Sequence, residues 1–219
     1  MYYPNYENPS LENPNKILFS VYATAVLMNL LKRQRDAIGL STFTHKLDFH
    51  SPNRTTQRHY RLLYNELDKL LKVNAIDQKR ETASSEALHQ ISEMLHKRSM
   101  VMVFTDMIAD DKDLEQQFEA FKHLKYNKHE VVLFYLTEPK TEIDLEFENK
   151  PHKFIDVESG QDIKLSPNQL KELYKEQAHN HITELKLKCL QYKIDFEEVD
   201  IDVCTKDGTK KYTILAKKK

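Results

Sequence analysis

The sequence predicts an α/β protein in which a doubly wound, mostly parallel sheet is flanked by helices. Segments with apolar residues at helical spacing alternate along the chain with short apolar runs, and this alternation is typical of layered α/β folds. The runs at 100–104 and 131–136 are almost continuously apolar, as expected for parallel strands that are buried on both faces. After Pro139 a strict alternation of apolar and acidic residues begins, which predicts a small antiparallel insertion over 140–165.

The first part of the chain is predicted to form two long helices separated by a hairpin. Asn13 and Pro14 open the first helix, whose apolar residues cover most of its circumference, so it is expected to pack on the sheet and on a neighbouring helix. The helix after the hairpin is amphipathic. In chain order these elements are a helix from 13 to about 34, strands at 37–43 and 44–49, and a helix at 55–72.

The second part alternates helices with strands and ends on a long helix and a strand. Helical spacing predicts helices over 82–96 and 111–127, on either side of the strand that ends at Asp106. Ser166 and Pro167 are typical of a helix start, because serine accepts hydrogen bonds from first-turn amides and proline has no amide to leave unpaired. The remaining elements are strands at 131–136, 154–157, 163–165 and 196–203.

No segment has the pattern of a membrane span or a signal peptide. The longest apolar stretch, Ile17–Leu31, contains Ser20 and Asn29 and is shorter than the roughly 20 residues that a span needs. It is expected to be a buried helix. Residues 1–15 carry glutamates and no basic residue, unlike a signal peptide, and are expected to form a loop.

Composition indicates one α/β domain over 1–219 and excludes several classes of protein. The 33 Lys and Arg nearly balance the 34 Asp and Glu, so the overall charge favours neither nucleic acid nor an anionic membrane as a partner. Cys189 and Cys204 have no CxxC spacing, which favours a reducing, cytoplasmic compartment. The chain has only 3 glycines and lacks the GxGxxG, Walker, GxSxG and HExxH motifs, so we expect no catalysis.

The strand that ends at Phe104 is followed directly by Thr105 and Asp106. In open α/β sheets ligands gather just beyond the carboxyl ends of the strands, so Asp106 is a candidate binding residue. Thr82, ahead of the preceding helix, would add a hydroxyl, and both side chains offer the oxygen ligands that Mg²⁺ prefers. The alternative interpretations are structural. Thr82 would be the N-cap of a helix that has Glu86 in its first turn, and Asp106 would orient the turn that follows the strand.

The segment at 34–43, with the sequence QRDAIGLSTF, and the apolar helix before it resemble the block that identifies a family of bacterial proteins, the "domain of unknown function fifty-eight". Later pieces occur in the family's order. They are the helix with Glu86-Ala87-Leu88, the strand that ends at Asp106, the inserted strands, and the long helix with Leu173-Tyr174. The resemblance spans nearly the whole chain and implies a fold similar to the von Willebrand factor A domain.

The resemblance also implies a magnesium site, from which this chain departs. In von Willebrand A domains a metal-ion-dependent adhesion site holds Mg²⁺ with a DxSxS loop, a threonine and an aspartate, and Thr82 and Asp106 match the last two. In the family the DxSxS loop is followed directly by a methionine, and this chain begins at Met1. We therefore expect an N-terminally truncated domain that binds Mg²⁺ only with ligands upstream of Met1. Its open sheet edge would favour a homodimer.

The expected function is that of a protein-binding or scaffold module. Its partner is expected at the carboxyl edge of the sheet, around Asp106, Asp110, Tyr2 and Tyr3. The resemblance implies that this partner is a MoxR-type AAA ATPase in the bacterial cytoplasm.

Two competing interpretations use the same residues differently. The first is a metal-dependent hydrolase or phosphoryl-transfer enzyme built on Asp106, Asp110 and Asp111. The second is a structural component whose cation site has decayed, so that replacing Thr82 or Asp106 with alanine alters stability alone, by about 1 kcal/mol for a lost cap.

Overall fold

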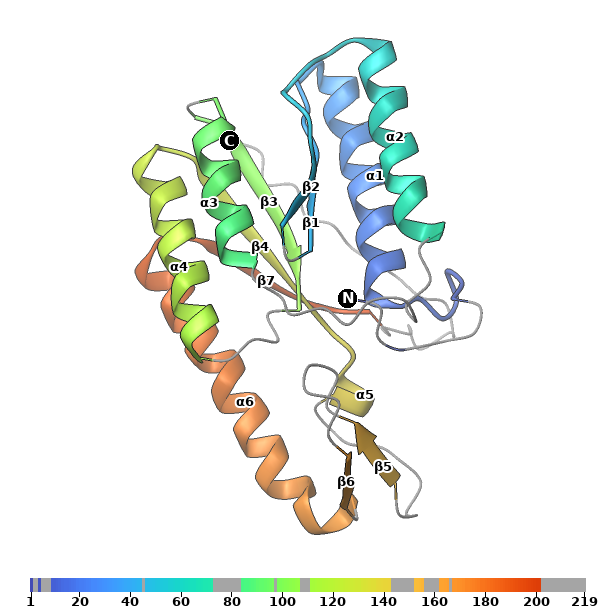
Figure 1. The fold of residues 1–219 in the computed structure, drawn as a ribbon, viewed down its shortest axis with the longest axis vertical. Coiled ribbons are helices and arrows are strands. Elements are labelled where there is room, and N and C mark those ends of the chain that lie inside the picture. Colours follow the sequence, from blue (N-terminus) through green and yellow to red (C-terminus); the bar gives the residue numbers. More distant parts are fainter. Residues whose placement is uncertain are drawn as a thin grey trace.

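Figure 1 shows the fold of the chain in a computed structural model. The structure describes residues 1, 4, 9–44, 46–72, 84–96, 98–106, 111–142, 152–155, 162–165 and 167–201. Among the helices of these residues, none is both long and apolar enough to cross a membrane.

Helices and strands alternate along the chain as the sequence predicts. The helices are α1 (Lys16–Gln34), α2 (Gln57–Lys72), α3 (Ser84–Met94), α4 (Asp111–Tyr126), α5 (Pro139–Glu142) and α6 (Pro167–Gln191). The strands are β1 (Ser41–Phe43), β2 (Leu47–His50), β3 (Met100–Thr105), β4 (Glu130–Thr137), β5 (His152–Ile155), β6 (Asp162–Leu165) and β7 (Asp195–Asp200). The short helix α5 stands where the sequence predicts the antiparallel insertion to begin, and the alternating stretch at 143–147 lies outside the described residues.

Local signals set the two ends of α1. The side chain of Asn15 caps the first turn by accepting a hydrogen bond from the Leu18 amide at 2.9 Å. At the other end Arg35 adopts a left-handed conformation with φ of 64°, and the Asp36 amide donates back to the Leu31 carbonyl at 3.0 Å. The helix therefore begins and ends close to the predicted residues.

A parallel sheet with the strand order β3-β4-β7 lies at the centre of the described residues. Val103 of β3 lies beside Leu133 of β4, which lies beside Phe196 of β7. Strands β1 and β2 pair in an antiparallel hairpin, and so do β5 and β6. The predicted parallel sheet, the first hairpin and the later antiparallel pair are thus confirmed.

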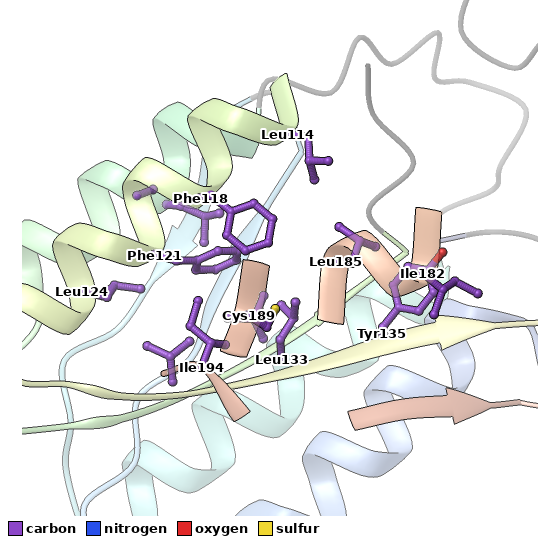
Figure 2. Close-up of a cluster of buried hydrophobic side chains, with 14 residues drawn as sticks. Leu114, Phe118, Phe121, Leu124, Leu133, Tyr135, Ile182, Leu185, Cys189 and Ile194 are labelled. Carbon is purple, nitrogen blue, oxygen red and sulfur yellow. The ribbon is translucent and has the colours of Figure 1, made fainter. Parts of the chain in front are cut away.

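Helices cover both faces of the parallel sheet. On one face α3, α4 and α6 bury a core that includes Leu133, Phe121 and Leu185 (Figure 2), each at most 1% exposed. Each such burial contributes about 1.5–3 kcal/mol. On the other face Phe19 of α1 packs against Leu136 of β4, while α2 packs on α1 through a separate cluster. The molecule is therefore a layered α/β protein.

Candidate binding site at the carboxyl edge of the sheet

Strands β3 and β4 place two acidic residues at the same edge of the sheet. The strands are parallel, with Thr105 beside Tyr135. Asp106 comes directly after β3 and Glu138 directly after β4. This is the edge at which open α/β sheets bind ligands, and the structure places Asp106 there, as the sequence predicts.

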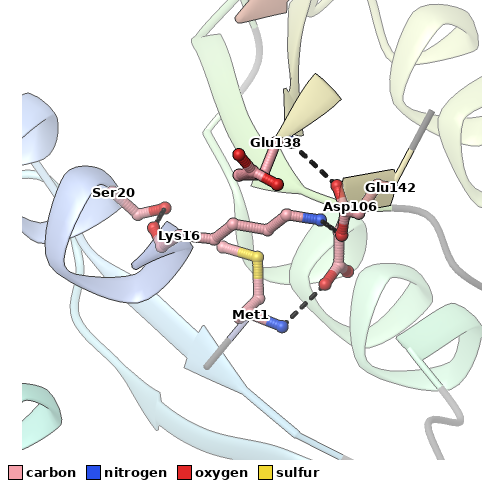
Figure 3. A network of polar contacts seen from close by, with 6 residues as sticks. All are labelled: Met1, Lys16, Ser20, Asp106, Glu138 and Glu142. Atoms are coloured by element: carbon pink, nitrogen blue, oxygen red, sulfur yellow. Dashed lines mark hydrogen bonds and ion pairs between the residues drawn. The ribbon is translucent and has the colours of Figure 1, made fainter. Parts of the chain in front are cut away.

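Asp106 lies close to two positively charged groups. Its side chain is 19% exposed, and its Oδ2 accepts a hydrogen bond from the amino group of Met1 at 2.6 Å (Figure 3). Burial acts to raise the pKa of this carboxyl, but the charges of the Met1 amino group and of Lys16, helped by hydrogen bonds, hold the pKa below its ordinary value. Asp106 is therefore an anion at neutral pH.

Lys16, the first residue of α1, is the second positively charged group. Its side chain is 1% exposed and forms an ion pair with Oε1 of Glu142, the last residue of α5. A lysine at this position is unfavourable beside the positive end of the helix dipole, and burial removes its hydration. The acidic groups at the sheet edge therefore hold the start of α1 in place.

Glu142 connects Lys16 to the end of β4. Its Oε2 accepts a hydrogen bond from the Glu138 amide at 2.8 Å. Glu138 and Thr137 are 4% and 3% exposed, and Thr137 Oγ1 has no hydrogen-bond partner among the described residues. A buried polar atom left unsatisfied costs about 1–3 kcal/mol. The Thr137 hydroxyl is therefore a destabilising feature beneath this edge of the sheet.

We call this group of side chains and the Met1 amino group the edge cluster (Figure 3). It combines three carboxylates with the ammonium groups of Met1 and Lys16, and among these carboxylates Asp106 is held anionic by the two positive charges. The members of the edge cluster are Met1, Lys16, Asp106, Glu138 and Glu142.

The described residues do not fit a magnesium site. Magnesium binds several hard oxygen ligands in near-octahedral geometry. In the part of the chain that the structure describes, no group of three or more His, Cys, Asp or Glu is arranged to hold a metal ion. Ammonium groups balance the charge of Asp106 instead.

Of the other site candidates singled out in the sequence, Asp111 alone lies within the described residues. Asp111, from the enzyme interpretation, is the first residue of α4. Four further candidates lie outside the described residues, namely Tyr2, Tyr3, Thr82 and Asp110.

Sequence reasoning missed Lys16, Glu138 and Glu142. Glu138 follows β4 as directly as Asp106 follows β3, and this parallel is the signal that would have found it. Lys16 is the one charged residue between positions 16 and 31, which marks it as unusual in a buried helix. Glu142 lies in a four-residue helix that is too short to show a periodic pattern.

The fold and the edge cluster define an α/β protein with a cluster of charged side chains at the carboxyl edge of a parallel sheet. The family described as "Protein of unknown function DUF58" matches residues 10–184, and the chain belongs to this family. None of the curated proteins compared with the chain matches it. The chain is also similar to a solved structure described as "conserved hypothetical protein BatB from Bacteroides thetaiotaomicron". The two share 16% identity over 82% of this chain and 80% of the other, with a TM-score of 0.45, and this likeness carries no argument.

Proposed function

We propose that this chain is a protein-docking module whose partner binds at the edge cluster. The observation that carries the proposal is the charge network at the carboxyl edge of the sheet, in which the buried Lys16 faces the partly buried carboxylates of Glu142 and Asp106. Buried ion pairs stabilise a fold no better than well-packed apolar side chains do. Their presence at the edge where such sheets bind ligands therefore favours a role in binding.

The partner we propose presents a lysine or arginine side chain to Asp106, where it takes the place of the Met1 amino group. Two facts support this chemistry. An ammonium group lies 2.6 Å from Asp106 Oδ2 in the structure, and the lowered pKa of the carboxyl keeps it anionic. Charge-assisted hydrogen bonds between such groups are shorter and stronger than neutral ones.

The proposal includes a von Willebrand A-like fold, a cytoplasmic location and a MoxR-type AAA ATPase as the partner. A parallel sheet with helices on both faces supports the fold. The buried free thiol of Cys189 suits a reducing compartment. The family resemblance alone supports the ATPase.

The proposal also includes magnesium-dependent docking and a homodimer, each of which depends on a further condition. Magnesium dependence requires ligands beyond the described residues, Thr82 among them. A homodimer is supported by β3, which within the described residues pairs with a strand on one side, because a strand with a free edge promotes association.

The test compares Asp106→Asn with Asp195→Asn in cross-linking capture from the source cells, with Mg²⁺ and with EDTA. Asp195 is an exposed aspartate at the start of β7, so the control removes the same charge from the opposite edge of the sheet. We expect Asp106→Asn to lower recovery of one partner about tenfold, because it removes a charged hydrogen bond. Equal capture by both variants would contradict the proposal.

The competing functions give different results in the same variants. Metal-dependent turnover of an ester or phosphoester that is lost in Asp106→Ala would establish the enzyme interpretation. A change in stability with unchanged capture would establish the structural one.

A further inference from the structure

Arginines gather at the end of α1 that lies opposite the edge cluster. Between residues 32 and 61 seven Lys and Arg stand against two Asp and Glu, a net charge of +5, whereas the whole chain has a net charge of −1. Five of the seven arginines of the chain lie here, and we call them the arginine surface. They are Arg33, Arg35, Arg54, Arg58 and Arg61.

Hydrogen bonds hold the segments that carry these arginines together. The amides of Ile38 and Arg54 each donate to the other's carbonyl at 3.1 Å. Tyr60 Oη donates to the Asp36 carbonyl at 3.1 Å, and His59 Nε2 lies 2.9 Å from the Ile38 carbonyl. The end of α1 and the start of α2 consequently lie together, at the top of Figure 1. The 19 residues of α1 separate this end from the edge cluster by about 28 Å.

The five arginine side chains lie exposed on the surface and form no ion pair with another described residue. Further along α2, in contrast, Lys69 pairs with Glu66 and Lys72 with Asp68. The first turn of α2 also has no acidic residue, although a helix start favours one. Repulsion between like charges opposes this arrangement, so it favours an external anion.

We propose that the arginine surface binds an acidic segment of a protein partner. The planar guanidinium group matches a carboxylate with two parallel hydrogen bonds. Exposed leucines lie beside the arginines on both helices. Leu30 is 39% exposed three residues before Arg33, and Leu62 is 44% exposed four residues after Arg58, positions that share a helix face with those arginines. A segment with acidic and apolar side chains would contact both kinds of residue.

Two other anionic partners fit these observations less well. A nucleic acid binds mainly through its dense array of phosphates, and the net charge of −1 gives the chain as a whole no attraction for it. A membrane-binding helix carries its apolar face and its basic residues along the same length, whereas the exposed apolar residues of α1, Tyr22, Val26 and Leu30, run from the arginines toward the opposite end of the helix. The arginine surface is also independent of the edge cluster, so either site can fail its test without affecting the other.

The test measures binding of a short fluorescein-labelled peptide, rich in Glu and containing Leu, by fluorescence anisotropy at low ionic strength. The variant R54Q/R58Q/R61Q is compared with the control K69Q/K72Q/K122Q, which removes the same charge from exposed lysines elsewhere. We expect the arginine variant to bind about tenfold more weakly and the control to stay within about twofold of the original protein. A third variant, R54K/R58K/R61K, keeps the positive charges but loses the planar guanidinium groups that form two parallel hydrogen bonds with a carboxylate. It should bind with intermediate affinity. Thermal melts of all variants check that each is folded.

Several results would overturn the proposal. They are absence of peptide binding by the original protein, an equal loss in the lysine control, and undiminished binding of a peptide with Gln in place of Glu. Tighter binding of a duplex oligonucleotide, or of phosphatidylglycerol vesicles, at the same ionic strength would assign the arginine surface to that class of partner instead.

Discussion

Replacing Lys16 with methionine tests the edge cluster at its most buried charge. Methionine keeps an unbranched apolar chain of similar length and removes the ammonium group. Because Lys16 is 1% exposed and paired with Glu142, the variant leaves that carboxylate without its partner. Asp106, whose pKa Lys16 helps to lower, also loses a neighbouring positive charge.

The expected loss of stability follows from the burial of the two partners. Removing one member of a buried ion pair costs about 3–5 kcal/mol. The Glu142 side chain is 20% exposed, so water solvates part of its charge, and we expect a value near the lower end, about 3 kcal/mol. For a chain of this size each kcal/mol shifts the melting temperature by about 2–4 °C, which gives a drop of about 6–12 °C.

Two further variants separate the ion pair from general effects of the substitution. Lys186→Met breaks an ion pair with Glu198 whose side chains are 49% and 35% exposed, and it should cost less than about 1 kcal/mol. The double variant K16M/E142Q removes both charges, keeps a side-chain oxygen that can accept from the Glu138 amide, and should recover most of the lost stability, because it leaves no buried charge without its partner.

Urea unfolding followed by circular dichroism at about pH 7 measures the free energy of unfolding of all four proteins. The reasoning is refuted if Lys16→Met loses no more stability than Lys186→Met. It is refuted equally if the double variant is less stable than Lys16→Met alone.

Three other predictions concern ionisable groups. Because the pKa of Asp106 is lowered, its contribution to stability is complete above the unfolded value of about 3.9 and is lost as pH falls through the folded pKa. Urea unfolding below about pH 4 should therefore show a smaller loss in Asp106→Asn, and an identical acid profile would contradict this. Burial lowers the pKa of His129, whose Nδ1 accepts from the Ser99 amide at 3.2 Å. Its contribution is present above about pH 6.5 and falls at lower pH, whereas His129→Asn, which keeps an acceptor, should lack that dependence. Burial raises the pKa of Cys189 to about 12, so peptide mapping should find it unmodified by iodoacetamide at about pH 8 until urea unfolds the chain; rapid native labelling would contradict its burial.

The fold follows from local patterns, which is why most of it could be predicted. The apolar spacing of α2 and the continuous runs of β3 and β4 depend on near neighbours in the sequence. Asp106 could be placed at the sheet edge because it directly follows an apolar run. A family resemblance in the block at 34–43 added the connection to DUF58, which the match over 10–184 confirms.

The ion pairs of the edge cluster could not be predicted in the same way. Met1 and Asp106 are separated by 105 positions in the chain, and Lys16 and Glu142 by 126 positions. No periodic pattern links residues at such distances. The meeting of Lys16 and Glu142 depends on how α1 packs against the sheet and on the short turn of α5. The sequence pointed to oxygen ligands for a cation at Asp106, whereas the structure supplies ammonium groups from Met1 and Lys16.

Hydrogen–deuterium exchange of the chain with and without its captured partner tests most directly whether the edge cluster is a docking site. The account predicts slower exchange in peptides that cover 98–106 and 130–142, where Asp106, Glu138 and Glu142 lie, and loss of that protection in Asp106→Asn. Unchanged exchange in both of these segments, with the partner bound, would contradict it.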